Sequence, residues 1–119
     1  MTNEETYQIM KAAFETYNTL KPGYLESVYE AALEWELLQA GFAVRRQVRI
    51  PVFYKGVELK KDFYADMVVN DRIIVELKAV SSLKPVHEKQ LASYLKSTGM
   101  QEGMLLNFGN LRRLEWRVA

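Results

Sequence analysis

The spacing of apolar residues along the first third of the chain predicts two helices. In residues 4–19 the apolar side chains recur at helical spacing, and Thr2 or Asn3 can cap the first turn. A second helix is expected over residues 24–40, because a Lys-Pro-Gly break precedes it and Gly41 suits the position after its last turn.

The middle of the chain changes to the alternating pattern that is typical of β-strands. Strands are expected over residues 42–54, 58–69 and 73–80, joined by a turn at Lys-Gly-Val and by a tight connection at Asn70-Asp71-Arg72. Pro51 lacks a backbone N–H, so it indicates an edge strand or a bulge. These three strands read as an antiparallel meander.

The last third predicts one more helix and two more strands. A helix is expected over about 85–97, with Pro85 in its first turn and Gly99 at its end. Residues 102–109 read as a short buried strand, and residues 112–118 as a final edge strand. The expected fold class is therefore α/β, more narrowly α+β: a mixed sheet flanked by helices in the order ααβββαββ.

Length and composition narrow the function classes. With 119 residues, one domain over residues 1–119 is expected. The sequence has no cysteine and only one histidine, His87, which excludes thiolate zinc sites, histidine-rich metal sites and cysteine nucleophiles. No apolar run is long enough to span a membrane, and the polar, acidic start lacks the apolar core of a signal peptide, so a cytoplasmic location is expected.

Charge is balanced overall but unevenly placed. The net charge is +1, yet residues 1–40 contain seven glutamates against two lysines. The part from residue 41 onward is basic and includes several clusters that could contact phosphates: Arg45-Arg46-Arg49, Lys55, Lys60-Lys61 and Arg112-Arg113. A basic face on the strands is compatible with a polyanionic partner, and an ordinary solvated surface is the alternative.

Three charged residues stand inside two otherwise apolar strands: Asp66, Glu76 and Lys78. Strand alternation places Glu76 and Lys78 on one face, and it places Asp66 opposite Ala65 and Met67. A two-residue turn would pair Asp66 with Val75 and separate the two carboxylates. A three-residue loop would pair Asp66 with Glu76, and Tyr64 with Lys78.

Two carboxylates brought together in this way would repel each other unless a cation lay between them. Mg²⁺ prefers oxygen ligands and commonly uses one or two carboxylates, with water or phosphate completing the shell. Lys78 would then lie beside the ion and could orient water or stabilise charge on a phosphate. The alternative is a plain ion pair between Lys78 and a carboxylate on the solvated face of the sheet.

The pattern Asp66-x9-Glu76-x-Lys78 resembles the signature of the PD-(D/E)xK nuclease superfamily, whose fold is restriction-endonuclease-like. The letters "GYLESVY" from Gly23, followed by "IPVFYKG", "ADMVVNDRIIVELKAV", "HEKQLASYLK" and "LLNFG", are similar to the bacterial GxxExxY proteins, an uncharacterised group classed within that superfamily. One departure is Ala65, which stands where the signature has proline.

The resemblance implies roles for further residues. Asp66, Glu76, the Leu77 backbone carbonyl and Glu26 would be metal ligands, and Lys78 would position or activate water. Glu26 matches a carboxylate that this superfamily often places near the metal, although an acid at this position can also cap the first turn of its helix.

Gln90 and Tyr94 share a helical face. They resemble a Q-x3-Y element that faces the active site in RecB-like exonucleases. A buried tyrosine with a glutamine partner is the alternative, and His87, one turn earlier, can reach the same face.

The activity that the resemblance implies is Mg²⁺-dependent cleavage of nucleic acid, in the first place DNA, with Mn²⁺ as a substitute ion. A non-catalytic module that binds nucleic acid or protein is the alternative. A homodimer is also expected, because cutting two strands calls for two sites related by symmetry. The first helix, the edge strand 42–54 and Trp35 are the candidate contacts.

Overall fold

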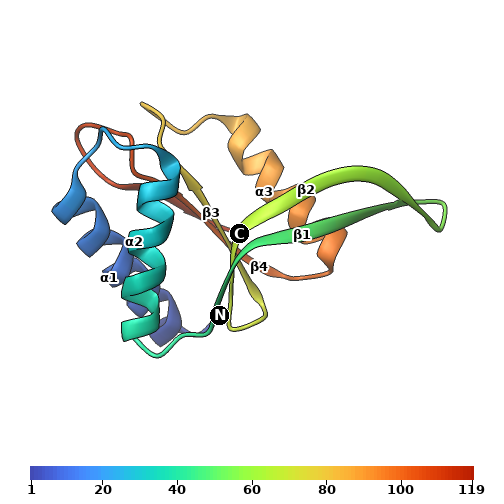
Figure 1. The fold of residues 1–119 in the computed structure, drawn as a ribbon, viewed down its shortest axis with the longest axis horizontal. Helices are drawn as coiled ribbons and strands as arrows, with labels where there is room; N and C mark the ends of the chain where they lie inside the picture. Colours follow the sequence, from blue (N-terminus) through green and yellow to red (C-terminus); the bar gives the residue numbers. More distant parts are fainter.

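One five-stranded sheet divides the molecule into two layers of helix, with α1 and α2 on one face and α3 on the other (Figure 1). The computed structural model describes residues 1–119. Its elements are α1 (Asn3–Leu20), α2 (Glu26–Gln39), β1 (Val44–Tyr54), β2 (Val57–Val69), β3 (Ile73–Lys78), α3 (Pro85–Thr98), β4 (Glu102–Asn107) and β5 (Glu115–Val118). The expected order ααβββαββ is confirmed.

The strands follow each other across the sheet in the order β1-β2-β3-β4-β5. Every neighbouring pair is antiparallel except β3 and β4, which are parallel. A parallel pair needs a crossover long enough to return the chain to the same end of the sheet, and α3 provides it. The two strands expected at the edges, β1 and β5, are the edges of the sheet.

The core has two parts, one on each face of the sheet. The larger cluster lies under α1 and α2 and includes Ile73, Val75 and Leu77 of β3. The smaller cluster lies under α3 and includes Ile74 and Tyr94. Because β3 is covered on both faces, four of its six side chains are apolar, and a charged residue there is costly unless it has partners.

The β2–β3 connection has the three-residue form. Val69 pairs with Ile73, and the intervening Asn70 and Asp71 both have positive φ, which their side chains tolerate. One part of the expectation is wrong, however. Backbone pairing stops after Met67 and Val75, so the ladder reaches neither the expected pair of Asp66 with Glu76 nor that of Tyr64 with Lys78.

The expected faces of β2 are also partly wrong. Ala65 packs with Val68 under α3, whereas Met67 packs under α2, so Ala65 and Met67 lie on opposite faces of the sheet. Simple alternation fails here at the point where pairing with β3 ends and where Gln47 of β1, between the paired residues Arg46 and Val48, has a positive φ of 52°.

Beyond this point β1 and β2 continue alone as a long two-stranded ribbon that projects from the body of the molecule (Figure 1). Pro51 interrupts its register, and the ladder resumes at the pair Val52–Leu59. The expected bulge is therefore confirmed. Element boundaries moved slightly: α2 begins at Glu26, and β5 begins at Glu115.

None of the helices combines the length and the apolar character required to cross a membrane.

Candidate active site

The candidate site lies at the fork where β2 separates from β3. Here two side chains replace the missing rungs of the backbone ladder. The Asp66 amide donates a hydrogen bond to Glu76 Oε1 at 3.1 Å, and the Leu77 amide donates to Asp66 Oδ2 at 2.8 Å. Each carboxylate therefore reaches across to the backbone of the other strand, and the two acids are held against each other.

Glu76 is buried, with an exposed fraction of only 3%. Burial, the neighbouring Asp66 carboxylate and a side-chain hydrogen bond with Asp66 raise the pKa of Glu76 to about 9, although the amide of Asp66 and the ammonium of Lys78 act in the opposite direction. A carboxyl group with this pKa holds a proton at neutral pH unless a cation takes its place. This is the electrostatic arrangement expected of a carboxylate pair that binds a metal ion.

Lys78, at the end of β3, points toward α3 rather than forming a salt bridge. Its Nζ donates to Gln90 Oε1 at 3.0 Å, and Gln90 Nε2 donates to the Tyr94 hydroxyl at 3.1 Å. No carboxylate lies within 4 Å of the Lys78 ammonium. The alternative of a plain lysine–carboxylate ion pair is therefore absent.

Tyr94 links this row of hydrogen bonds to the carboxylates. Burial raises the pKa of Tyr94, and the nearby Glu76 and Asp66 carboxylates raise it further, while the hydrogen bond from Gln90 lowers it. The hydroxyl thus lies within the electrostatic field of both acids. Gln90 and Tyr94, expected from the sequence as a helical pair, are both at the site.

Glu26 approaches the same fork from the first turn of α2. Partial burial of its carboxyl and the repulsion from Asp66 raise its pKa, Lys78 lowers it, and Glu30 raises it again. No side chain caps the start of α2 by a hydrogen bond, although Glu26 is the acid of its first turn, where a negative charge is favourable. Glu26 remains an exposed residue, so it lies at the rim of the site rather than inside it.

The motif tyrosine three residues after Glu26 has a structural role. Tyr29 is fully buried, stacks on Phe108 with ring centroids 5.0 Å apart, and donates its hydroxyl proton to the Lys21 carbonyl at 2.6 Å. The same hydroxyl accepts a hydrogen bond from the Tyr24 amide. These contacts fix the loop that leads into α2 and so determine where Glu26 begins the helix.

Gln47 of β1 is a further side chain at the fork, and no sequence pattern indicated it. Gln47 Nε2 donates to both oxygens of Glu30, at 3.2 and 3.1 Å, and approaches Asp66 Oδ1 at 3.5 Å. Glu30 is buried and also accepts a hydrogen bond from Arg46 Nε at 3.0 Å. Gln47 therefore connects α2 to Asp66, and its left-handed backbone is what turns its side chain toward them.

Two residues that the sequence suggested for the site make structural contacts within their own surroundings. His87 Nδ1 accepts a hydrogen bond from the Lys84 amide at 2.9 Å and so closes the first turn of α3. The side chain of Leu77 is buried in the larger core cluster, and its amide holds Asp66.

The basic clusters divide into paired and unpaired groups. Arg45 pairs with Asp71, Arg46 with Glu30 and Glu34, and Arg49 with Glu58 and Asp62. These arginines are therefore partly neutralised within the protein. The ribbon lysines have no carboxylate partner within salt-bridge distance, and neither do Arg112 and Arg113.

The side chains at the fork supply only some of the ligands that a hard divalent cation needs. Nowhere in the chain do three or more acidic or histidine side chains gather closely enough to hold a metal by themselves. An ion here would have the two carboxylates Asp66 and Glu76 as its protein side-chain ligands, and backbone carbonyl and water would supply the rest. This is the composition that Mg²⁺ sites commonly have.

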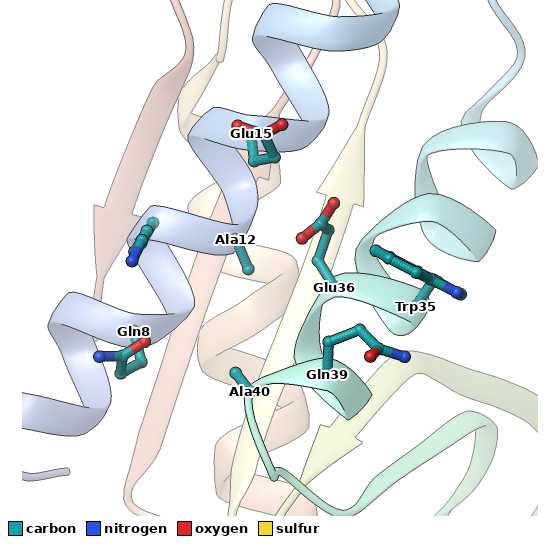
Figure 2. A pocket seen from close by; sticks show the side chains of 8 residues that line it. Gln8, Ala12, Glu15, Trp35, Glu36, Gln39 and Ala40 are labelled. Atoms are coloured by element: carbon teal, nitrogen blue, oxygen red, sulfur yellow. The ribbon is translucent and has the colours of Figure 1, made fainter.

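A well-formed groove on the surface lies away from the fork. It has a volume of about 470 Å³, lies between α1 and α2, and is lined by Gln8, Lys11, Ala12, Glu15, Trp35, Glu36, Gln39 and Ala40 (Figure 2). None of the residues at the fork lines it. The candidate site and this groove are therefore separate features of the molecule.

Comparison with known proteins shows which class of protein this chain belongs to. Residues 3–118 match the family model described as the PD-(D/E)XK nuclease superfamily, and the chain belongs to this family. One solved structure has a similar fold. The crystal structure of SSO0001 superimposes with a TM-score of 0.58 at 22% identity, covering 77% of this chain and 48% of that one.

The chain thus spans about half the length of SSO0001, and at this identity the likeness shows the fold alone. No curated protein matches the sequence.

Proposed function

We propose that the protein is a metal-dependent phosphodiesterase that hydrolyses nucleic acid, in the first place DNA, with Mg²⁺ as its ion and Mn²⁺ as a substitute. The observation that supports this most directly is the fork itself. Asp66 and Glu76 face each other there, and the Lys78 ammonium lies beside them without a carboxylate partner. Superfamily membership agrees with the same reaction class.

In this proposal each residue at the fork has a distinct role. Asp66 and Glu76 would hold the ion together with the Leu77 carbonyl, Glu26 at the rim would reach it through a bound water, and the ion would polarise the scissile phosphate. Lys78 orients the attacking water and stabilises negative charge on the phosphate. Gln90 holds the Lys78 ammonium in place, and Tyr94 holds Gln90.

Two substitutions test the proposal. Asp66→Asn and Lys78→Ala should each reduce Mg²⁺-dependent cleavage of a labelled DNA by at least about a hundredfold, the loss typical of removing one charged catalytic group. Matched controls are Asp71→Asn and Lys96→Ala, which change the same residue types at exposed positions away from the fork. Both controls should cleave like the parent protein.

The proposal fails if Lys78→Ala cleaves as fast as the parent, or if the parent cleaves equally well in excess chelator. Thermal melting of each variant must accompany the assay, because only a folded variant is informative. Asp66→Asn keeps the size of the side chain, which favours folding.

A second candidate function is a module that binds nucleic acid or protein without cutting. The observation that favours it is that no three acidic side chains converge at the fork. A crystal soaked in Mn²⁺ separates the two candidates. Manganese bound between Asp66 and Glu76 supports catalysis, whereas a fork that stays free of manganese at millimolar concentration supports the binding module.

Two further proposals concern the group of proteins within the superfamily and the oligomeric state. We propose that the chain belongs to the GxxExxY group, on the motif that runs from Gly23 through Glu26 to Tyr29. We also propose that it forms a homodimer through the groove between α1 and α2. Trp35 is 60% exposed at this groove, and an exposed tryptophan on a helix is an effective anchor for a partner (Figure 2).

A further inference from the structure

The β1–β2 ribbon has more exposed apolar surface than a structural hairpin requires. Beyond the fork it extends away from both helical layers (Figure 1). Its exposed large apolar side chains are Phe53, Tyr54, Val57, Leu59, Phe63 and Tyr64, each at least 39% exposed. Four of them, all but Phe53 and Tyr64, share one face of the ribbon by their cross-strand pairing, and exposed apolar residues grouped on one face of a soluble protein favour a binding site.

The two faces of the ribbon differ in charge. On one face Arg49 forms salt bridges with Glu58 and Asp62, and Phe53 stands opposite Glu58. This face contains both acids of the ribbon.

The other face begins at the body of the protein with Ile50 and Phe63, which pair with each other, and Ile50 lies in the core under α3. Cross-strand partners share a face. The pairs Val52–Leu59 and Tyr54–Val57 therefore continue the same face toward the tip. This face, which we call the acid-free face, carries no carboxylate.

Lysines border the acid-free face and have no acidic partner. Lys60 and Lys61 lie in the bulge opposite Pro51, between the pairs Ile50–Phe63 and Val52–Leu59. Lys55 is at the tip, with its ammonium 5.5 Å from the centre of the Tyr54 ring. Arg49 lies between the two acids of the ribbon and offsets the charge of one of them, so four basic side chains and two acids leave residues 49–64 with a net charge of +2. The surface therefore favours an anionic partner over a neutral apolar one.

The acid-free face leads directly to the candidate site. Phe63 lies at its inner end with its ring centroid 6.4 Å from that of Tyr94. Tyr94 in turn is joined through Gln90 to Lys78. A ligand lying along this face would therefore arrive at the side of the fork where the lysine stands.

We propose that the acid-free face of the ribbon binds a single strand of nucleic acid and guides it to the fork. The inference rests on the proposed function and names its substrate class. Exposed aromatic rings alternating with unpaired lysines are the features that bind single strands, since rings stack on bases and lysines contact phosphates. A duplex in the same position would bury its bases and leave the rings of Tyr54 and Phe63 without partners.

The test measures binding in excess chelator, where no cleavage occurs. A fluorescently labelled thymidine 20-mer is titrated with the parent protein and with Tyr54→Ala, using anisotropy. Tyr54→Ala should weaken binding about tenfold or more, in the range of one lost stacking contact. The matched control is Phe53→Ala, which removes an equally exposed ring from the opposite face and should bind like the parent.

Salt dependence tests the lysines separately. For single strands the slope of log affinity against log salt falls by about 0.7 for each phosphate contact that is lost. The triple variant with Lys55, Lys60 and Lys61 changed to alanine should lose about two units of slope. Lys96→Ala should leave the slope unchanged.

Several results would overturn the inference. They are equal weakening by Tyr54→Ala and Phe53→Ala, an unchanged slope in the triple variant, or tighter binding of the matched duplex than of the single strand. A fourth is that Tyr54→Ala binds the 20-mer normally but dissociates a dimer in sedimentation, which would assign the face to a second copy.

A separate assay keeps the two proposals distinguishable. The parent protein is tested for Mg²⁺-dependent hydrolysis of a small phosphodiester, thymidine 5′-(p-nitrophenyl phosphate), which is too short to reach the ribbon. If the parent hydrolyses the small diester and Tyr54→Ala binds the 20-mer normally, only the proposed role of the acid-free face is refuted. Loss of 20-mer binding in Tyr54→Ala while the parent shows no hydrolysis refutes only the catalytic proposal.

Discussion

The protonation of one side chain, Glu76, ties the stability of the protein to pH. Its folded-state pKa is raised to about 9 from an ordinary value of 4.5. Between these two values the unfolded chain loses the Glu76 proton and the folded chain keeps it. The stabilising contribution of Glu76 to the free energy of unfolding is therefore fully present below about pH 4.5, and it is lost as the pH rises toward 9.

We expect Glu76→Gln to remove this dependence. In excess chelator the parent should lose on the order of 1.4 kcal/mol of unfolding free energy per pH unit through this group inside the window. The variant, with a neutral amide, should melt at a similar temperature to the parent at pH 4.5 and at a clearly higher temperature at pH 8.5. Differential scanning fluorimetry across the pH range measures both. A parallel decline of the two proteins would contradict the raised pKa.

Gln47 gives a second prediction at the residue scale. Gln47→Gly keeps the left-handed backbone without strain but removes the amide that joins Glu30 to Asp66. Because groups that orient a metal ligand typically contribute tenfold or more to metal affinity, Mn²⁺ binding measured by calorimetry should weaken about tenfold. The melting temperature in chelator should also fall, because the buried Glu30 carboxylate loses the hydrogen bonds from Gln47.

Gln47→Asn is the matched control for this prediction. Asparagine tolerates positive φ and retains a shorter amide, so it should restore part of the affinity. Equal Mn²⁺ affinity in Gln47→Gly and the parent would show that Gln47 does not position Asp66.

At the residue scale, sequence patterns identified the charged residues of the candidate site but not the side chain that positions them. Asp66, Glu76 and Lys78 stood out because charges interrupt apolar strands. Gln47 did not, because a polar residue on an edge strand is ordinary and nothing in the letters signals its positive φ. The register of the β2–β3 hairpin also stayed open, since Asn70 and Asp71 suit a two-residue turn as well as the longer loop that forms.

At the scale of elements, the segment after β3 is held by a buried polar group. Asn107 donates to the carbonyl of Val80 at 2.9 Å and accepts from its amide at 3.0 Å. Asn107 also donates to Glu115 of β5, which accepts a further hydrogen bond from the amide of Leu83. The path from Lys78 to α3 is therefore fixed by β4 and β5, far along the chain.

Gly109 makes this path possible and gives a prediction. A Cβ at this position would lie 2.4 Å from the Ala79 carbonyl carbon and 2.4 Å from the Val80 nitrogen, both of which are backbone atoms. Gly109→Ala should therefore cost about 1–3 kcal/mol of unfolding free energy, the usual penalty of overpacking, and should reduce cleavage by displacing the chain that follows Lys78. Urea denaturation measures the loss.

The control for this prediction is Gly103→Ala. Its closest approach, 2.8 Å, is to the end of the Leu91 side chain, which can move aside, so its cost should be smaller. A larger loss in Gly103→Ala than in Gly109→Ala would contradict the account.

The element order was predictable because helices and strands have different periods, and proline and glycine separate them. The ends of the elements were not, since the last residues of a strand depend on its partner. The expected strand 73–80 stops at Lys78 because Asn107 takes up the amide and the carbonyl of Val80. Alternation failed at Ala65 for a related reason, because it assumes a flat ladder where the sheet divides.

At the scale of the whole molecule, the open prediction is the oligomeric state. If the groove between α1 and α2 is a dimer interface, sedimentation equilibrium at micromolar concentration should give twice the chain mass of 13.8 kDa. Trp35→Ala should shift the protein to the monomer, because an exposed tryptophan is a common anchor of such contacts. A monomeric parent at these concentrations would exclude a stable dimer.

The parallel pairing of β3 with β4 has a consequence for how the chain folds. The meander of β1, β2 and β3 is local, whereas β4 can join only after α3 has crossed over, so the free edge of β3 is exposed for longer. That edge is a run of β-branched and apolar residues, which is prone to pair with other chains. Glu76 and Lys78 are the only charges in it. We therefore expect that they also act as gatekeepers against aggregation during folding, a second reason for this strand to retain them.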